Sequence, residues 1–190
     1  PRNTTKNRVE SKIDERQDEE EIKSPQEMIE DSIEEINSSL ADELLDTILD
    51  KDPRFFEDLI VDLLVKMGYG QGRATQYVSD SGIDGIITTD ALGFDPIYTQ
   101  AKRYAKDHRV GRPELQAFAG ALGNVARGVF ITTSSFNSSA VDFASRYPHA
   151  TIVLIDGQKL SELMIKYDLG VTIERSFQVK RLDIDYFEQA

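Results

Sequence analysis

The sequence contains no cysteine among its 190 residues and only two histidines. Without cysteine the chain can form neither a disulfide framework nor a thiolate metal site, which fits a cytoplasmic protein. No apolar run reaches the length of a membrane span, and the first residues are too polar for a signal peptide. The 39% of hydrophobic residues suffice for one packed core plus an appendage.

The net charge of −12 argues against nucleic-acid binding only until its distribution is considered. Residues 1–46 carry six Lys or Arg and 15 Asp or Glu, which leaves a net charge of only −3 for the rest of the chain. Residues 98–112 carry five Lys or Arg against one Asp, a local charge of +4. A local cationic stretch can attract phosphates, although a solvated loop is an equally good reading of that pattern alone.

The first fifty residues predict an arm followed by a helix. Residues 1–23 are charged and nearly free of large apolar groups, so we expect a disordered arm or linker. Ser24, Pro25 and Glu27 then form a helix-start signature. Apolar residues recur at three- and four-residue steps through residues 24–50, which indicates an amphipathic helix. Its stripe needs a partner, and a homodimer through this helix is one possibility.

Residues 51–190 predict one α/β domain. Asp52 and Pro53 begin a second helix, and a glycine-rich turn at 68–72 follows it. Two antiparallel strands joined by residues 91–95 come next, and helices then alternate with two apolar strands. This order favours a mixed sheet covered by helices on both faces. Residues 171–184 read as a final strand or an extended tail.

The hairpin carries an unusual set of polar side chains. Symmetric pairing about Gly93 would place Asp84 opposite Lys102, and alternation keeps Gln100 on the same face. A carboxylate in an otherwise apolar strand needs a partner or a metal. One reading is an Asp84–Lys102 ion pair that fixes the hairpin. The other is a hard-cation site formed by Asp84, the Gln100 amide oxygen and the Ala101 carbonyl, with Lys102 beside it.

Several segments in order resemble the catalytic domain of Mrr-type restriction endonucleases. They are "FEDLIVDLLVKMGYG", "GIDGIITTD", "YTQAKRY", "GVFITTSSFNSSAVDFA" and "IVLIDGQKLSELM". The resemblance covers residues from about 53 to about 170 and makes 51–190 the expected nuclease domain. It implies a restriction-endonuclease-like, three-layer α/β/α fold of the PD-(D/E)xK superfamily. It also implies metal-dependent hydrolysis of DNA phosphodiesters in the restriction of foreign or methylated DNA.

The resemblance assigns roles to four side chains. Asp84 matches the metal-binding aspartate, Lys102 the motif lysine, and Glu57 the glutamate of the preceding helix. Gln100 stands where the wider superfamily has a second acid, as is usual in Mrr-like sequences. The expected cofactor is Mg²⁺, with Mn²⁺ as a substitute. Members commonly carry an upstream winged-helix recognition domain, and we expect this chain to lack it.

The cationic stretch completes the hypothesis. Arg103, Lys106, Arg109 and Arg112 are expected to receive the backbone of double-stranded DNA. A rival reading keeps the fold as a non-catalytic DNA-binding or assembly module. A third reading places a phosphate at the turn of residues 132–139, which lacks a phosphate-loop signature.

Overall fold

The computed structural model describes residues 23–73, 82–88, 90 and 92–188. The arm predicted for 1–23 therefore lies outside the described residues except for its last position. In chain order the elements are α1 (Pro25–Leu49), α2 (Pro53–Lys66), β1 (Gln71–Arg73), β2 (Gly85–Thr88), β3 (Pro96–Lys102), β4 (Arg109–Val110), α3 (Arg112–Leu122), β5 (Arg127–Thr132), β6 (Ser135–Phe136), α4 (Ser138–Arg146), β7 (Thr151–Ile155), α5 (Gly157–Lys166) and α6 (Ile184–Glu188).

The central sheet is mixed, as predicted. Its strands lie in the order β1-β2-β3-β5-β7. The first three pair antiparallel, and β3, β5 and β7 pair parallel. A separate pair of very short strands, β4 and β6, joins the cationic stretch to the segment after β5. The sheet therefore places the end of the β2–β3 hairpin beside the end of a buried parallel strand.

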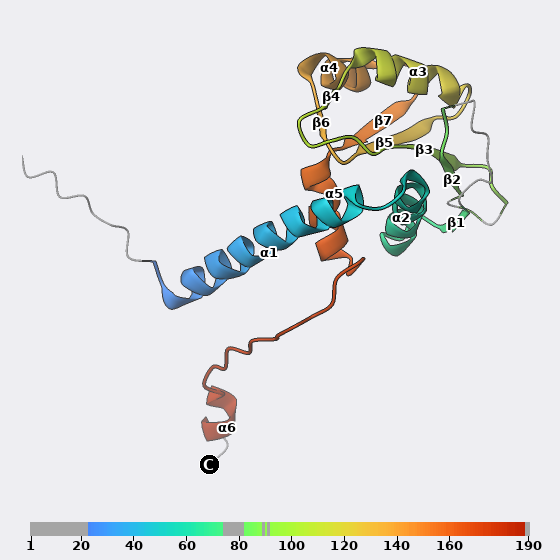
Figure 1. Ribbon diagram of the computed structural model, residues 1–190. Coiled ribbons are helices and arrows are strands. Elements are labelled where there is room, and N and C mark those ends of the chain that lie inside the picture. Colours follow the sequence, from blue (N-terminus) through green and yellow to red (C-terminus); the bar gives the residue numbers. More distant parts are fainter. Residues whose placement is uncertain (1–22, 74–81, 89, 91, 189–190) are drawn as a thin grey trace, which may run out of the picture.

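Helices cover both faces of the sheet and give the predicted three layers (Figure 1). One apolar cluster joins α1, α2 and α5 to one face. A second cluster joins α3 and α4 to the other face. Each cluster is built from residues that alternate along the strands, because successive strand side chains point to opposite faces. The fully buried Ile131 and Phe130, which are adjacent in β5, belong to different clusters.

The amphipathic helix α1 begins and packs for reasons visible in its sequence. Ser24 and Glu27 form the predicted capping box. The C-terminal half of its apolar stripe is buried in the core, at Leu44 and Ile48. The N-terminal half stays exposed. The predicted homodimer through this helix remains a prediction, and only the N-terminal half is available for it.

Two local features differ from expectation, and a third was left open between two alternatives. The segment read as a turn at 68–72 ends in strand β1, which adds an edge to the sheet. The segment after β5 contains β6 before helix α4 begins. Residues 171–183 take the extended alternative rather than a strand, and every residue from 172 to 188 is exposed.

No described helix is both long enough and apolar enough to span a membrane.

Candidate active site

The β2–β3 hairpin holds three of the predicted site residues. Its register pairs Gly85 with Thr99 and Ile86 with Tyr98, and Asp84 lies just before this ladder, with its N–H bonded to the Thr99 carbonyl. The expected pairing of Asp84 with Lys102 was therefore wrong by two residues. Because two residues is also the period of side-chain alternation, the shift keeps Gln100 and Lys102 on one face of β3. The bond from the Ala101 N–H to the Asp84 carboxylate brings Asp84 to the same end of the hairpin.

The hairpin loop explains the shift. The carboxylate of Asp90 accepts hydrogen bonds from the backbone N–H groups of Leu92, Phe94 and Asp95. This side-chain cap extends the loop on its N-terminal side and moves its centre away from Gly93. The prediction was centred on Gly93 and did not include these hydrogen bonds of the Asp90 side chain.

Asp84 is fixed by the strand beside it. Its Oδ2 accepts a hydrogen bond from the Ala101 N–H at 2.8 Å, and its own N–H donates to the Thr99 carbonyl at 2.8 Å. The N–H and C=O of a strand residue point to the same side, so the Ala101 carbonyl also points to this edge. Since β2 begins only at Gly85, the carbonyl and the Asp84 carboxylate share an edge where the β2–β3 ladder has ended.

Gln100 and Lys102 contact each other directly. When the Gln100 amide is assigned the orientation that satisfies both of its ends, its Nε2 donates to the Gly82 carbonyl at 2.6 Å and its Oε1 accepts from the Lys102 Nζ at 3.0 Å. Gln100 is buried and Lys102 is half-buried. This assignment of the buried amide directs its oxygen toward the lysine.

The end of β5 anchors the lysine, a role that the sequence reasoning missed. The Thr132 hydroxyl donates to the Lys102 carbonyl at 2.8 Å. The Thr133 hydroxyl donates to the Tyr104 carbonyl at 2.6 Å and accepts from the Tyr104 N–H at 2.9 Å. Both threonines are buried, and these hydroxyls bond to the backbone. The phosphate reading of the 132–139 turn is therefore not supported at these two positions.

Glu57 approaches the hairpin from helix α2. Val61 lies four residues later on the same helix face. An added Cβ at Gly85 would lie 3.2 Å from the Val61 Cγ2 and 2.6 Å from the Thr99 Oγ1, so the helix packs closely on β2 there. This close approach next to Asp84 brings the Glu57 carboxylate to the same end of the hairpin. Glycine at position 85 is thus a requirement of the site's geometry.

The charges in this region act on one another. Burial, then the negative charges of Asp84 and Asp58, raises the pKa of the Glu57 carboxyl, while Lys102 and Arg54 partly offset the rise. A raised carboxyl pKa means that the ionised form is disfavoured in the folded protein. Two carboxylates and one ammonium group therefore lie within electrostatic reach, which is an arrangement that a cation would stabilise.

We predict that Glu57→Gln raises stability in the absence of divalent ions. Ionised Glu57 lowers the stability of the folded protein, and this loss is complete at a pH above the raised pKa of the folded state. The loss disappears as the pH falls below 4.5, the ordinary pKa of the carboxyl group. The gain at pH 7 should not exceed about 1 kcal/mol, because solvent screens a half-buried group. Urea unfolding in the presence of a chelator, at pH 7 and at lower pH, measures this gain in stability. Asp62→Asn on the same helix is the control. A loss of stability at pH 7 would contradict this electrostatic account.

The donor set fits a hard divalent cation. Among the described residues, no cluster of three or more His, Cys, Asp or Glu side chains could hold a metal ion. The hairpin instead offers the Asp84 carboxylate, the Gln100 amide oxygen and the Ala101 carbonyl oxygen. All are hard oxygen donors, and Mg²⁺ commonly binds through only one or two carboxylates, with water and phosphate completing its shell. Glu57 adds a second carboxylate beside them.

The cationic stretch divides into two parts. Contrary to the expectation of a phosphate contact, the Arg103 Nη1 donates to the Leu49 carbonyl at the end of α1, and the Arg103 Nε is buried. A side chain bound to a helix C-terminus in this way is a structural contact. The exposed Lys106 Nζ pairs with Asp46 Oδ1 of α1 at 2.7 Å. Helix α1 thus holds the N-terminal part of the stretch.

The remaining cations lie farther along. Arg109 is exposed in β4 and pairs through its backbone with Ser135 of β6. Arg112 is exposed at the start of α3, with its guanidinium carbon 5.4 Å from the centre of the Phe143 ring. Both positions leave a charged group at the surface, as the DNA-binding prediction requires.

The mixed sheet, its two helical layers and the polar hairpin end define a restriction-endonuclease-like α/β domain. The chain belongs to the family of restriction endonucleases with an Mrr-type catalytic domain, whose sequence model matches residues 48–164. It is 47% identical over 142 residues to the type IV methyl-directed restriction enzyme EcoKMrr of Escherichia coli (strain K12). That match covers 72% of this chain and 45% of the relative, so the chain spans about half of the relative's length.

Solved structures agree with the fold. The MspJI restriction endonuclease, in complex with a 27-mer oligonucleotide, superposes with a TM-score of 0.53 at 23% identity over 67% of this chain and 31% of that one. The DNA modification-dependent restriction endonuclease AspBHI superposes with a TM-score of 0.55 at 20% identity over 71% of this chain and 36% of that one. At these identities the likeness supports the architecture alone.

Proposed function

We propose that this chain is a divalent-metal-dependent DNA endonuclease that acts in restriction of foreign or methylated DNA. The observation that carries the proposal is the shared edge of Asp84 and the Ala101 carbonyl, with Gln100 and Lys102 on the adjoining strand. Family membership supports the reaction class. The methyl-directed role named for the relative supports the substrate, and a cytoplasmic location remains the expectation from composition.

Each residue has a proposed role. Asp84, Gln100 and the Ala101 carbonyl would hold the cation, for which Mg²⁺ is the first candidate and Mn²⁺ the second. When bound, the cation would supply Lewis acidity at the scissile phosphate and a more acidic water. Lys102 orients the attacking water and stabilises the negative charge that develops on the phosphate. Glu57 accepts hydrogen bonds from water on the opposite side of the site.

Supercoiled plasmid cleavage tests the proposal. Nicked and linear products should form with Mg²⁺ or Mn²⁺, and EDTA should abolish them. Methylated and unmethylated plasmids compared at equal superhelicity test the substrate preference. If the protein forms no products with either ion while the metals also fail to raise its melting temperature, the rival function as a non-catalytic DNA-binding or assembly module is favoured instead.

The path of DNA is proposed to run over Arg109 and Arg112, with Lys106 available only when it leaves Asp46. Both partners of that pair are largely exposed. A phosphate can therefore compete with the carboxylate at little cost. Arg103 is not assigned to DNA, because its guanidinium is engaged by the end of α1.

We predict that Asp46→Asn strengthens DNA binding. Removing the carboxylate frees Lys106, and an exposed ion pair contributes at most ~1 kcal/mol, so affinity should rise by about two- to five-fold. Fluorescence anisotropy at several salt concentrations, in the absence of divalent ions, measures the effect. Asp42→Asn removes the same charge one turn earlier in α1 and serves as the matched control. Equal affinities for the two variants would show that total charge, not release of Lys106, sets binding.

A further inference from the structure

The C-terminal tail, residues 171–183, is extended and has one apolar face. Val171, Ile173, Phe177 and Val179 lie on one face of the alternation, with Arg175 between them on that face, and the other face of residues 171–179 is polar. The last three of these apolar side chains are 71–76% exposed. Alternation of this kind is typical of a strand with one buried face, yet the tail pairs with no strand among the described residues. The tail therefore has the sequence pattern of a strand but has no strand partner among the described residues.

Strand β7 is an edge strand of the central sheet, within the described residues. It pairs with β5 on one side only, within the described residues. The Thr151 N–H donates to the Ala126 carbonyl beside β5, so alternation points the backbone groups of Ile152 and Leu154 outward at the open edge. An unpaired row of N–H and C=O groups is a template for another strand.

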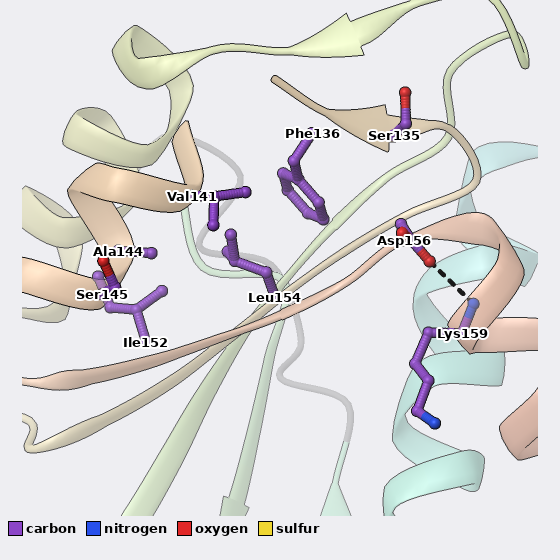
Figure 2. Close-up of a pocket in the computed structure, with 9 residues that line it drawn as sticks. All are labelled: Ser135, Phe136, Val141, Ala144, Ser145, Ile152, Leu154, Asp156 and Lys159. Carbon is purple, nitrogen blue, oxygen red and sulfur yellow. Dashed lines mark hydrogen bonds between the residues drawn. The ribbon is translucent and has the colours of Figure 1, made fainter. Parts of the chain in front are cut away.

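An apolar cavity lies beside that edge. Its volume is ≈ 400 Å³ (Figure 2). The apolar part of its lining includes Phe136, Val141, Ile152 and Leu154, and its rim is completed by the polar residues Ser135, Ser145, Asp156 and Lys159. The side chains of Ile152 and Leu154 face this cavity, whereas Val153 on the other face of β7 is 47% exposed. An added strand with one apolar and one polar face would therefore match both sides of β7. The tail has this pattern.

The chain cannot readily place its own tail there. The crossovers from β3 to β5 and from β5 to β7 use α3 and α4, which cover one face of the sheet, whereas α5 covers the other. A parallel strand added beyond β7 through α5 would therefore form a crossover of the opposite hand to the β3–β5 and β5–β7 crossovers. Crossovers between parallel strands are almost always right-handed, so this arrangement is disfavoured. An antiparallel strand would require the chain to recross the sheet, but residues 167–169 are hydrogen-bonded to the end of α5.

We propose that the tail of a second copy of this chain pairs with β7, by reciprocal strand exchange. Phe177 or Val179 of one copy then enters the apolar cavity of the other. Main-chain pairing at a sheet edge supplies affinity, and the cavity sets the register. The exchange forms a two-fold dimer with one site per subunit, and it does not depend on cleavage activity.

Full-length variants test the exchange by light scattering after size-exclusion chromatography. Phe177→Asp places a charge on the apolar face of the tail. Val141→Asp places a charge in the lining of the cavity, at an α4 position that is 48% exposed. Wild type should be dimeric and each variant alone monomeric. The controls Ser176→Asp, on the polar tail face, and Ser138→Asp, at the start of α4, should remain dimeric. Circular dichroism checks that every variant is folded.

Mixing the two variants separates exchange from other arrangements. The intact tail of Val141→Asp can pair with the intact edge of Phe177→Asp, so the mixture should form mixed dimers at concentrations well above the wild-type dissociation constant. A monomeric wild type would overturn the proposal. So would a dimer that survives both substitutions, which would instead implicate α1, or a mixture that stays monomeric, which would indicate docking of the tail within its own chain.

Discussion

Asp84→Asn is expected to lower the rate of plasmid cleavage by at least about 1,000-fold, because it removes the one acid in the metal-binding set and with it most of the cation's contribution. The substitution is nearly isosteric. The asparagine oxygen can still accept the hydrogen bond from the Ala101 N–H, which keeps the end of β3 in place. Single-turnover cleavage with saturating protein separates the chemical step from binding.

The control for Asp84→Asn is Asp107→Asn, which removes the same charge from an exposed position in the cationic stretch. It should leave the cleavage rate within about two-fold, as is usual for surface substitutions. Without metal, the melting temperature of Asp107→Asn should match that of the wild type, and that of Asp84→Asn should not fall below it, because the substitution removes a charge that repels Glu57. If Asp84→Asn retains more than a tenth of the wild-type rate, the carboxylate is structural and the rival reading gains.

Lys102→Met is the second substitution with a large expected effect. Methionine preserves most of the aliphatic stem but removes the ammonium group that lies beside the Gln100 amide. Loss of one group that stabilises developing charge typically costs about 10²–10³-fold in rate. DNA affinity without divalent ions should fall only two- to five-fold, as for loss of roughly one phosphate contact.

Lys106→Met is the matched control, because it removes the same charge from an exposed side chain four residues later. It should alter the salt dependence of DNA binding and leave the single-turnover rate at saturation unchanged. Equal losses of rate in both variants would mean that Lys102 acts only through general attraction of DNA. An increase in rate for Lys102→Met would exclude its proposed role altogether.

Side-chain alternation along the strands was predicted better than the contacts between segments. Alternation placed Gln100 and Lys102 on one face of β3, and that relation survives a two-residue error in register. The roles of these residues and of Asp84 remain predictions. The register itself depended on the Asp90 side chain, whose bonds to loop N–H groups are not a periodic signal. Arg103 was assigned to phosphate from composition, but it is bound to the end of α1.

Contacts between distant segments set the remaining features. The threonine pair at the end of β5 appeared as a capped turn because its bonds to Lys102 and Tyr104 join segments about thirty residues apart. The approach of Glu57 depends on the absence of a side chain at Gly85, a relation between helix and strand that no local pattern records. The tail has a strand pattern but has no strand partner within the described part of its own chain.

The most direct test of the account is a crystal structure with Mn²⁺, located by its anomalous scattering. We expect an ion bonded to a carboxylate oxygen of Asp84, the Gln100 amide oxygen and the Ala101 carbonyl, with Glu57 and Lys102 around it. Crystals of Asp84→Asn prepared in the same way should show no ion at this position. An ion bound elsewhere on the domain, or one that keeps its place in the variant, would contradict the proposed site.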